Sequence, residues 1–174
     1  MNSDLKKFSY LEGLEFSHGQ QDCYGMLVRV YKDFLQIDLT NYARPDDWWV
    51  YGGDLYVDNF AKEGFYCLPD DYPLQDIKPF DVFLVSIPDN RSKGGVTPTN
   101  HCAIYLGEGK IIHHRYGKRS CIRNYDGAMR NYTTHILRHK AVRSRPTKVD
   151  VVDLRKYILP HKRAMIDRVL QDGL

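Results

Sequence analysis

The sequence predicts an α+β fold in which one helix near the N-terminus packs on an antiparallel β-sheet. Two patterns support this prediction. Apolar side chains recur at helical spacing from residue 23 to residue 34, and from residue 81 onward short β-branched and aromatic segments alternate with turns. The 174 residues suffice for one domain with a substantial core, and a content of 27% charged residues is typical of a globular protein.

The helix is predicted to begin at Cys23. Its inward face consists of the apolar residues Cys23, Leu27, Val30, Tyr31 and Phe34. Asp22 precedes them, and because its carboxylate can accept the free amide hydrogens of the first turn, we expect it to be the N-cap. The Cys23 thiol would then lie at the positive end of the helix dipole.

Two segments separate this helix from the sheet. Residues 41–53 contain Pro45, the adjacent Trp48 and Trp49, and two glycines, which is typical of an ordered loop. Residues 54–64 carry apolar side chains at helical spacing and predict a second short helix.

The rest of the main domain is predicted to be mostly β-structure. The predicted strands are residues 81–87, 101–106, 110–113, 119–122 and 133–138. A glycine-rich turn joins the second and third of them, so we expect these two to form a β-hairpin. Residues 149–174 have periodic apolar positions interrupted by Pro160, and they predict a short C-terminal helical extension to a domain of residues 1–148.

Charge is distributed unevenly along the chain. Residues 1–100 contain 9 Lys and Arg against 16 Asp and Glu, whereas residues 101–148 contain 11 against 2. Such a division could attract anionic polymers, or it could reflect two segments that pair with each other or with neighbouring subunits.

The four cysteines show neither CxxC pairs nor a disulfide framework, so we expect reduced thiols, with Cys102 a small core residue of a strand. Residues 1–10 contain no apolar run of signal-peptide length, and no segment has the length and apolarity of a membrane span. We therefore expect synthesis and folding in a cytoplasm, without membrane insertion.

Three distant residues form a pattern suited to thiol catalysis. At a helix N-terminus beside a histidine, the pKa of a thiol can fall to roughly 3.5–7.5, which makes it a nucleophile near neutral pH. Cys23 has that placement, and His101 at the start of a strand could be its general base. His113 lies across the hairpin, where facing side chains are about 4.5–5.5 Å apart, so we expect it to hydrogen-bond His101 and fix its tautomer. First-turn amides would supply part of an oxyanion hole.

The same three residues also fit roles outside thiol catalysis. A cysteine at an apolar helix position is often only a small buried side chain, and a strand histidine is often a core or surface residue. Zinc could be bound by Cys23, His101 and His113, although neither a fourth ligand nor HxxxH spacing accompanies them. The sequence indicates no metal and no cofactor.

The segments Asp22–Gly25 (Asp-Cys-Tyr-Gly), His101–Gly107 and Ile111–His113 together resemble the NlpC-type cell-wall peptidases, a branch of the papain-like thiol hydrolases. More narrowly, Asn41–Pro45 before the paired tryptophans, and the His113-His114 doublet, resemble members carried in the tail tips of long-tailed phages. The resemblance covers roughly residues 10–140.

This resemblance implies a papain-like NlpC-type domain with Cys23 as nucleophile, His101 as general base and His113 as the group that orients it. Residues beside these three are expected to contact substrate: Asp22, Tyr24, Trp48, Trp49 and His114. Many members have Ser after the nucleophile and an upstream Tyr that helps to bind the oxyanion. Here Tyr24 follows Cys23, and the nearest upstream candidates are Tyr10 and Phe16.

The implied reaction is thiol-dependent hydrolysis of amide bonds in peptidoglycan stem peptides during host entry. The implied location is the virion: the protein would be made in the host cytoplasm, carried in the tail tip beside other tail-tip proteins, and act at the host cell wall or periplasm. No cofactor is implied.

Two other classes of function stay open. The first is a structural tail-tip or tail-assembly component that retains the peptidase fold without required catalysis, since the divided charge and the C-terminal extension could both dock neighbouring proteins. The second is nucleic-acid binding by the basic segment 101–148. No nucleic-acid-binding motif accompanies that charge, so we do not expect nucleic acid to be a partner.

Overall fold

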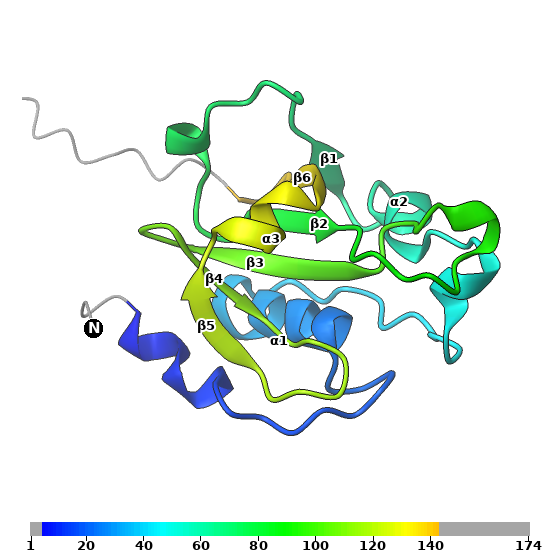
Figure 1. The fold of residues 1–174 in the computed structure, drawn as a ribbon. Helices are drawn as coiled ribbons and strands as arrows, with labels where there is room; N and C mark the ends of the chain where they lie inside the picture. Colours follow the sequence, from blue (N-terminus) through cyan, green and yellow to red (C-terminus); the bar gives the residue numbers. More distant parts are fainter. Residues whose placement is uncertain (1–4, 143–174) are drawn as a thin grey trace, which may run out of the picture. The chain divides into compact units, whose positions relative to one another are not determined.

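A six-stranded antiparallel sheet is the main element of the part of the chain that the structure describes (Figure 1). The computed structural model describes residues 5–142. In the order in which they lie in the sheet, its strands are β1 (Phe65–Cys67), β6 (Thr133–His139), β2 (Val82–Val85), β3 (His101–Gly107), β4 (Lys110–His113) and β5 (Cys121–Asn124). The α-helices of this part of the chain are α1 (Cys23–Leu35), α2 (Leu55–Asn59) and α3 (Gly127–Asn131). The expected α+β fold, with α1 packed on an antiparallel sheet, is confirmed.

The sheet is covered on both faces. Side chains of α1 pack on one face against alternate residues of β2 and β3, including Leu84, Cys102 and Ile104. The intervening residues, such as Phe83 and Ala103, point to the other face and pack with Met129 of α3. Because side chains alternate along a strand, β2 is apolar on both sides and fully buried, and most residues of β3 are buried as well.

Helix α1 begins and ends as its sequence dictates. The Asp22 carboxylate accepts a hydrogen bond from the backbone amide of Gly25 at 2.8 Å, which confirms the predicted N-cap. Gln36 ends the helix in the left-handed conformation with a φ of 58°. Val30 and Tyr31 in the middle of the helix are completely buried.

The predicted β-hairpin is formed by β3 and β4. Its two-residue loop is Glu108-Gly109, and φ is positive at both residues, 54° and 68°, as the turn that matches strand twist requires. The register places Ala103 opposite His113. His101, two residues earlier on β3, therefore lies diagonally from His113 on the same face of the sheet.

Several predicted boundaries differ from those observed. The strand predicted at 119–122 begins two residues later, and the helix predicted over 54–64 is one short helix, α2, followed by turns. A 3₁₀ turn, Trp48–Tyr51, lies inside the loop predicted at 41–53. Strand β1 and helix α3 were not predicted, because three and five residues are too few to produce a periodic pattern. The predicted helical extension, residues 149–174, lies outside the described residues.

A buried ion pair joins the start of β2 to β6. Both nitrogens Nε and Nη2 of Arg138 donate to the Asp81 carboxylate, at 2.7 and 2.5 Å, and both side chains are almost fully buried. Phe80, just before this aspartate, adopts a φ of 76°, which is rare for a bulky residue. Its ring packs against Phe8 and Phe34, so aromatic contacts hold it in that conformation. None of the described helices has the length and apolarity needed to cross a bilayer.

Replacing Asp81 with Asn should destabilise the protein by about 3–5 kcal/mol, because Arg138 would keep a buried charge without its counter-ion. Urea unfolding followed by circular dichroism measures this change. Asp38→Asn is the matched control, since its pair with Lys32 is largely exposed and should contribute no more than about 1 kcal/mol. Equal effects of the two substitutions would contradict the assigned role of the buried pair.

Candidate active site

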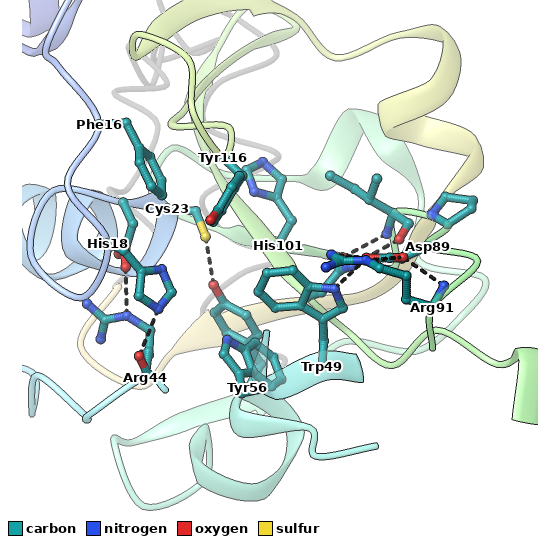
Figure 2. Close-up of a pocket in the computed structure, with 15 residues that line it drawn as sticks. Phe16, His18, Cys23, Arg44, Trp49, Tyr56, Asp89, Arg91, His101 and Tyr116 are labelled. Carbon is teal, nitrogen blue, oxygen red and sulfur yellow. Dashed lines mark hydrogen bonds and ion pairs between the residues drawn. The ribbon is translucent and has the colours of Figure 1, made fainter. Parts of the chain in front are cut away.

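A pocket of about 220 Å³ opens at the N-terminal end of α1 (Figure 2). Its floor contains Cys23 and His101. The other residues that line it are Phe16, His18, Asp22, Arg44, Trp48, Trp49, Tyr56, Ile87, Pro88, Asp89, Arg91, Asn100 and Tyr116. They come from segments distant in sequence, and aromatic side chains are frequent among them.

The position of Cys23 depends on a close approach between the turn before α1 and the helix itself. A Cβ atom at Gly25 would lie only 1.9 Å from the carbonyl oxygen of Gln20, so only glycine fits there. The Asp22 carboxylate ties the same turn to the helix, since it also accepts from the amide of Gly19 at 2.7 Å. The Gly of the Asp-Cys-Tyr-Gly segment therefore lets the chain fold tightly around the thiol.

Arg44 completes this arrangement. Its Nε donates to the Asp22 carboxylate at 2.8 Å, and both side chains are only 4% exposed. Its Nη1 donates to Asn41 Oδ1 and to the carbonyl oxygen of Tyr42. The Asn41–Pro45 segment thus holds the start of α1. Asp22 lines the pocket, but its carboxylate is already bonded within the protein.

His101 and His113 are brought together as expected. His101 Nε2 lies 2.9 Å from His113 Nδ1, and both rings are buried. Burial, together with the neighbouring charge of His101, lowers the pKa of His113 to about 3, so this ring is neutral at physiological pH. When His101 is protonated, its Nε2 must donate and His113 Nδ1 must accept, which assigns the single proton of His113 to its Nε2. His101 Nδ1 is then the nitrogen available to the thiol.

The pocket favours the charged form of the nucleophile. The neighbouring Cys102 thiol makes the largest contribution to lowering the pKa of Cys23 well below its ordinary value. Burial opposes this change, while the hydrogen bond and positive charge of His101 and a hydrogen bond from Tyr56 reinforce it. The surroundings of Cys23 therefore favour its thiolate form.

Tyr56 is a site residue that sequence reasoning missed. Its hydroxyl lies 3.0 Å from Cys23 Sγ, and burial raises its pKa well above the usual value, so it keeps its proton and can donate (Figure 2). Asp54 positions it: one carboxylate oxygen caps α2 at the amide of Val57, and the other accepts from the amide of Thr99. Because Thr99 stands two residues before His101, the same carboxylate links Tyr56 to the start of β3.

Aromatic residues form the walls of the pocket. Trp48 and Trp49 both line it, and the Trp49 ring lies edge-to-face with Tyr116, at 6.0 Å between centroids. The Trp49 indole donates to Asp89, whose carboxylate also binds Arg91. The tryptophans expected to contact substrate are therefore at the pocket.

Two other residues expected to contact substrate do not line it. Tyr24 points into the core, where its hydroxyl donates to the carbonyl oxygen of Thr40 and its ring packs against Tyr56. His114 is completely buried and packs edge-to-face with Phe16, which does line the pocket. Both residues support the walls from behind.

The arrangement can carry out nucleophilic acyl chemistry. It contains a thiolate at a helix start, a histidine beside it, a second histidine that fixes the tautomer of the first, and a hydroxyl donor at the sulfur. Over residues 5–142, no three or more His, Cys, Asp or Glu side chains are grouped so that they could hold a metal ion.

The chain is similar to several known proteins. Residues 13–138 match the NlpC/P60 family. The chain is 33% identical over 135 residues to tail tip assembly protein K of Escherichia phage lambda. The matched region covers 78% of this chain and 62% of that protein. It is 30% identical over 129 residues to tail tip assembly protein K of Escherichia phage N15, with coverages of 74% and 49%. The chain thus spans less than two thirds of the length of these relatives. Among solved structures, NlpC2 from Trichomonas vaginalis is 17% identical with a TM-score of 0.47, over 76% of this chain and 43% of that one.

The lowered pKa of Cys23 predicts its reactivity toward iodoacetamide. Since the thiolate is the reactive form, labelling of Cys23 should stay fast as the pH falls below neutral. As the pH falls, Cys67 should stop reacting at a higher pH than Cys23 does, because partial burial raises the pKa of Cys67. His101→Ala should move the Cys23 profile toward alkaline pH, because a hydrogen bond and a positive charge are lost. Mass spectrometry of both peptides across a pH series makes the measurement, and coincident wild-type profiles would contradict it.

Proposed function

The chain belongs to the NlpC/P60 family, and we propose that it is a cysteine peptidase of a phage tail tip that cleaves amide bonds in peptidoglycan stem peptides. The observation that carries this proposal is the Cys23 sulfur at the start of α1, hydrogen-bonded to Tyr56 and beside the His101–His113 pair. That geometry supports catalytic roles for these residues.

Attack by the Cys23 thiolate on a substrate carbonyl would form a tetrahedral oxyanion. The first amide hydrogens of a helix have no partner within it, so the Cys23 amide can donate to this oxyanion. The Tyr56 hydroxyl is the second candidate donor. When the sulfur that it contacts bonds to carbon, the sulfur loses its charge, and the hydroxyl can donate to the oxyanion instead. Protonated His101 would then give its proton to the leaving amine, and a water molecule activated by neutral His101 would hydrolyse the thioester.

The aromatic pocket supports a peptide as the substrate. Trp49 and Tyr116 flank the approach to Cys23, and Asp89 with Arg91 lies at the far end of the pocket (Figure 2). Flat rings can cover an extended backbone, while these charged groups can bind amine and carboxylate substituents of stem peptides. Asp22 would act on the substrate indirectly, through the position of α1.

The tail-tip location is supported by the two phage relatives, both called tail tip assembly protein K. A protein of this kind would be synthesised in the host cytoplasm, assemble with other tail-tip proteins, and reach the host cell wall in the virion. Those same names favour a second candidate, a tail component that keeps the peptidase fold without needing catalysis.

Cys23→Ala should reduce the release of peptides from purified peptidoglycan by roughly 10⁴- to 10⁶-fold, because the nucleophile is removed. Chromatography with mass spectrometry of the digested muropeptides measures this and identifies the bond cleaved. A matching circular dichroism spectrum controls for folding. Turnover equal to that of the wild type would refute the assigned nucleophile, and virions carrying Cys23→Ala that infect normally would favour the structural candidate.

Substitutions of His113 separate orientation from packing. His113→Ala removes the acceptor for His101 Nε2–H and should lower kcat by about 10²- to 10⁴-fold. His113→Asn places an amide oxygen near the same point and should retain activity to within about tenfold. The ratio of the two rates in the same peptidoglycan assay is the measurement. Equal losses in both variants would mean that His113 acts only through packing.

A further inference from the structure

A second thiol lies against the nucleophile, and the proposed peptidase reaction does not use it. Cys102 on β3 is completely buried, and its Sγ donates a hydrogen bond to the backbone carbonyl oxygen of Cys23 at 3.2 Å. It points to the face of the sheet on which α1 packs, in the same cluster as Cys23. Two thiols thus meet where the start of a helix rests on a strand.

We propose that Cys102 is a resolving thiol, which captures Cys23 as an intramolecular disulfide after a hydroperoxide has oxidised it. The disulfide would switch the site off reversibly and protect the sulfur from further oxidation. Only the effect on activity rests on the proposed peptidase function. The formation of the disulfide depends on the two thiols alone.

The chemistry balances with hydrogen peroxide as the oxidant. The Cys23 thiolate attacks one peroxide oxygen, the O–O bond breaks, and Cys23 sulfenic acid and hydroxide are formed. Cys102 sulfur then attacks the sulfenic sulfur, forming the S–S bond and breaking the S–O bond. The departing hydroxide and the Cys102 proton make water. The hydroxide from the first step takes up the proton that the Cys23 thiol released on ionising. In total, two thiols lose two electrons and one peroxide becomes two water molecules.

The surroundings of the two sulfur atoms give them different roles in this reaction. Cys23 lines the pocket and is reached by small solutes, whereas Cys102 has no exposed surface. The neighbouring Cys102 thiol and His101 lower the pKa of Cys23, and burial raises the pKa of Cys102. Peroxide therefore meets a thiolate at Cys23, while Cys102 waits as a protonated thiol.

No other described cysteine is placed to compete. Cys67 stands on the edge strand β1, where its thiol donates to the carbonyl oxygen of Leu68. Cys121 opens β5, on the far side of β4 from β3. All four thiols are free, so the distance to Cys23 decides which of the other three can form a disulfide with it after peroxide treatment.

The first experiment needs no substitution. The wild-type protein is treated with hydrogen peroxide, alkylated, digested without reductant and examined by mass spectrometry. We expect one linked pair of peptides, containing Cys23 and Cys102 and lighter by two hydrogens, that separates on treatment with dithiothreitol. A wild-type sample in which Cys23 is instead found as sulfinic or sulfonic acid would overturn the proposal.

The second experiment uses Cys102→Ala and the closer isostere Cys102→Ser. After peroxide treatment, dithiothreitol should restore most of the peptidase activity of the wild-type protein. In either variant it should restore less than about a tenth of the activity, because Cys23 there proceeds to irreversible oxidation. Cys67→Ser is the matched control and should behave as wild type. Full recovery in both Cys102 variants would overturn the proposal. If the protein cleaves no peptidoglycan, the linked peptides still decide the question, and only the proposed function fails.

Discussion

The buried carboxylate of Asp22 fixes where the nucleophile lies. It accepts from the amides of Gly19 and Gly25 and from Arg44, at 2.7, 2.8 and 2.8 Å, so the turn before α1, the first turn of α1 and the following loop meet at one side chain. An unpaired buried carboxylate would be costly, and these three donors compensate its desolvation. Catalytic geometry at Cys23 is therefore a consequence of how this charge is satisfied.

A second carboxylate, that of Asp54, fixes the opposite wall of the pocket in the same way. It caps α2 and binds the amide of Thr99, so that it links the helix that carries Tyr56 to the start of β3. Around the Cys23 sulfur lie Tyr56 of α2, whose hydroxyl is 3.0 Å away, and the His101 and Cys102 side chains of β3, which lower the pKa of the thiol. Short elements hold the site because carboxylates tie them together: Asp22 accepts three hydrogen bonds and Asp54 accepts two.

Local patterns in the sequence predicted the parts of this site that depend on local rules. Helical spacing and a capping aspartate located Cys23, and hairpin spacing placed His101 beside His113. Tyr56 was missed because its approach to the sulfur depends on the tertiary link from Asp54, which no periodicity records. Tyr24 was expected to contact substrate from its place next to the nucleophile. One helical step of about 100° instead turns it into the core, where it supports Tyr56 from behind.

The neighbours of Cys23 and the burial of His113 make the stability of the protein depend on pH. The pKa of Cys23 is lower in the folded protein than in an unfolded chain, so the stability that its thiolate contributes is lost as pH falls through the folded value. His113 acts in the same direction: between its unfolded value near 6.5 and its folded value of about 3, the unfolded chain binds the extra proton. Acid therefore acts on both parts of the site, because it protonates Cys23 and His113. His113 must be neutral to accept a hydrogen bond from His101, and Cys23 must be charged to pair with His101.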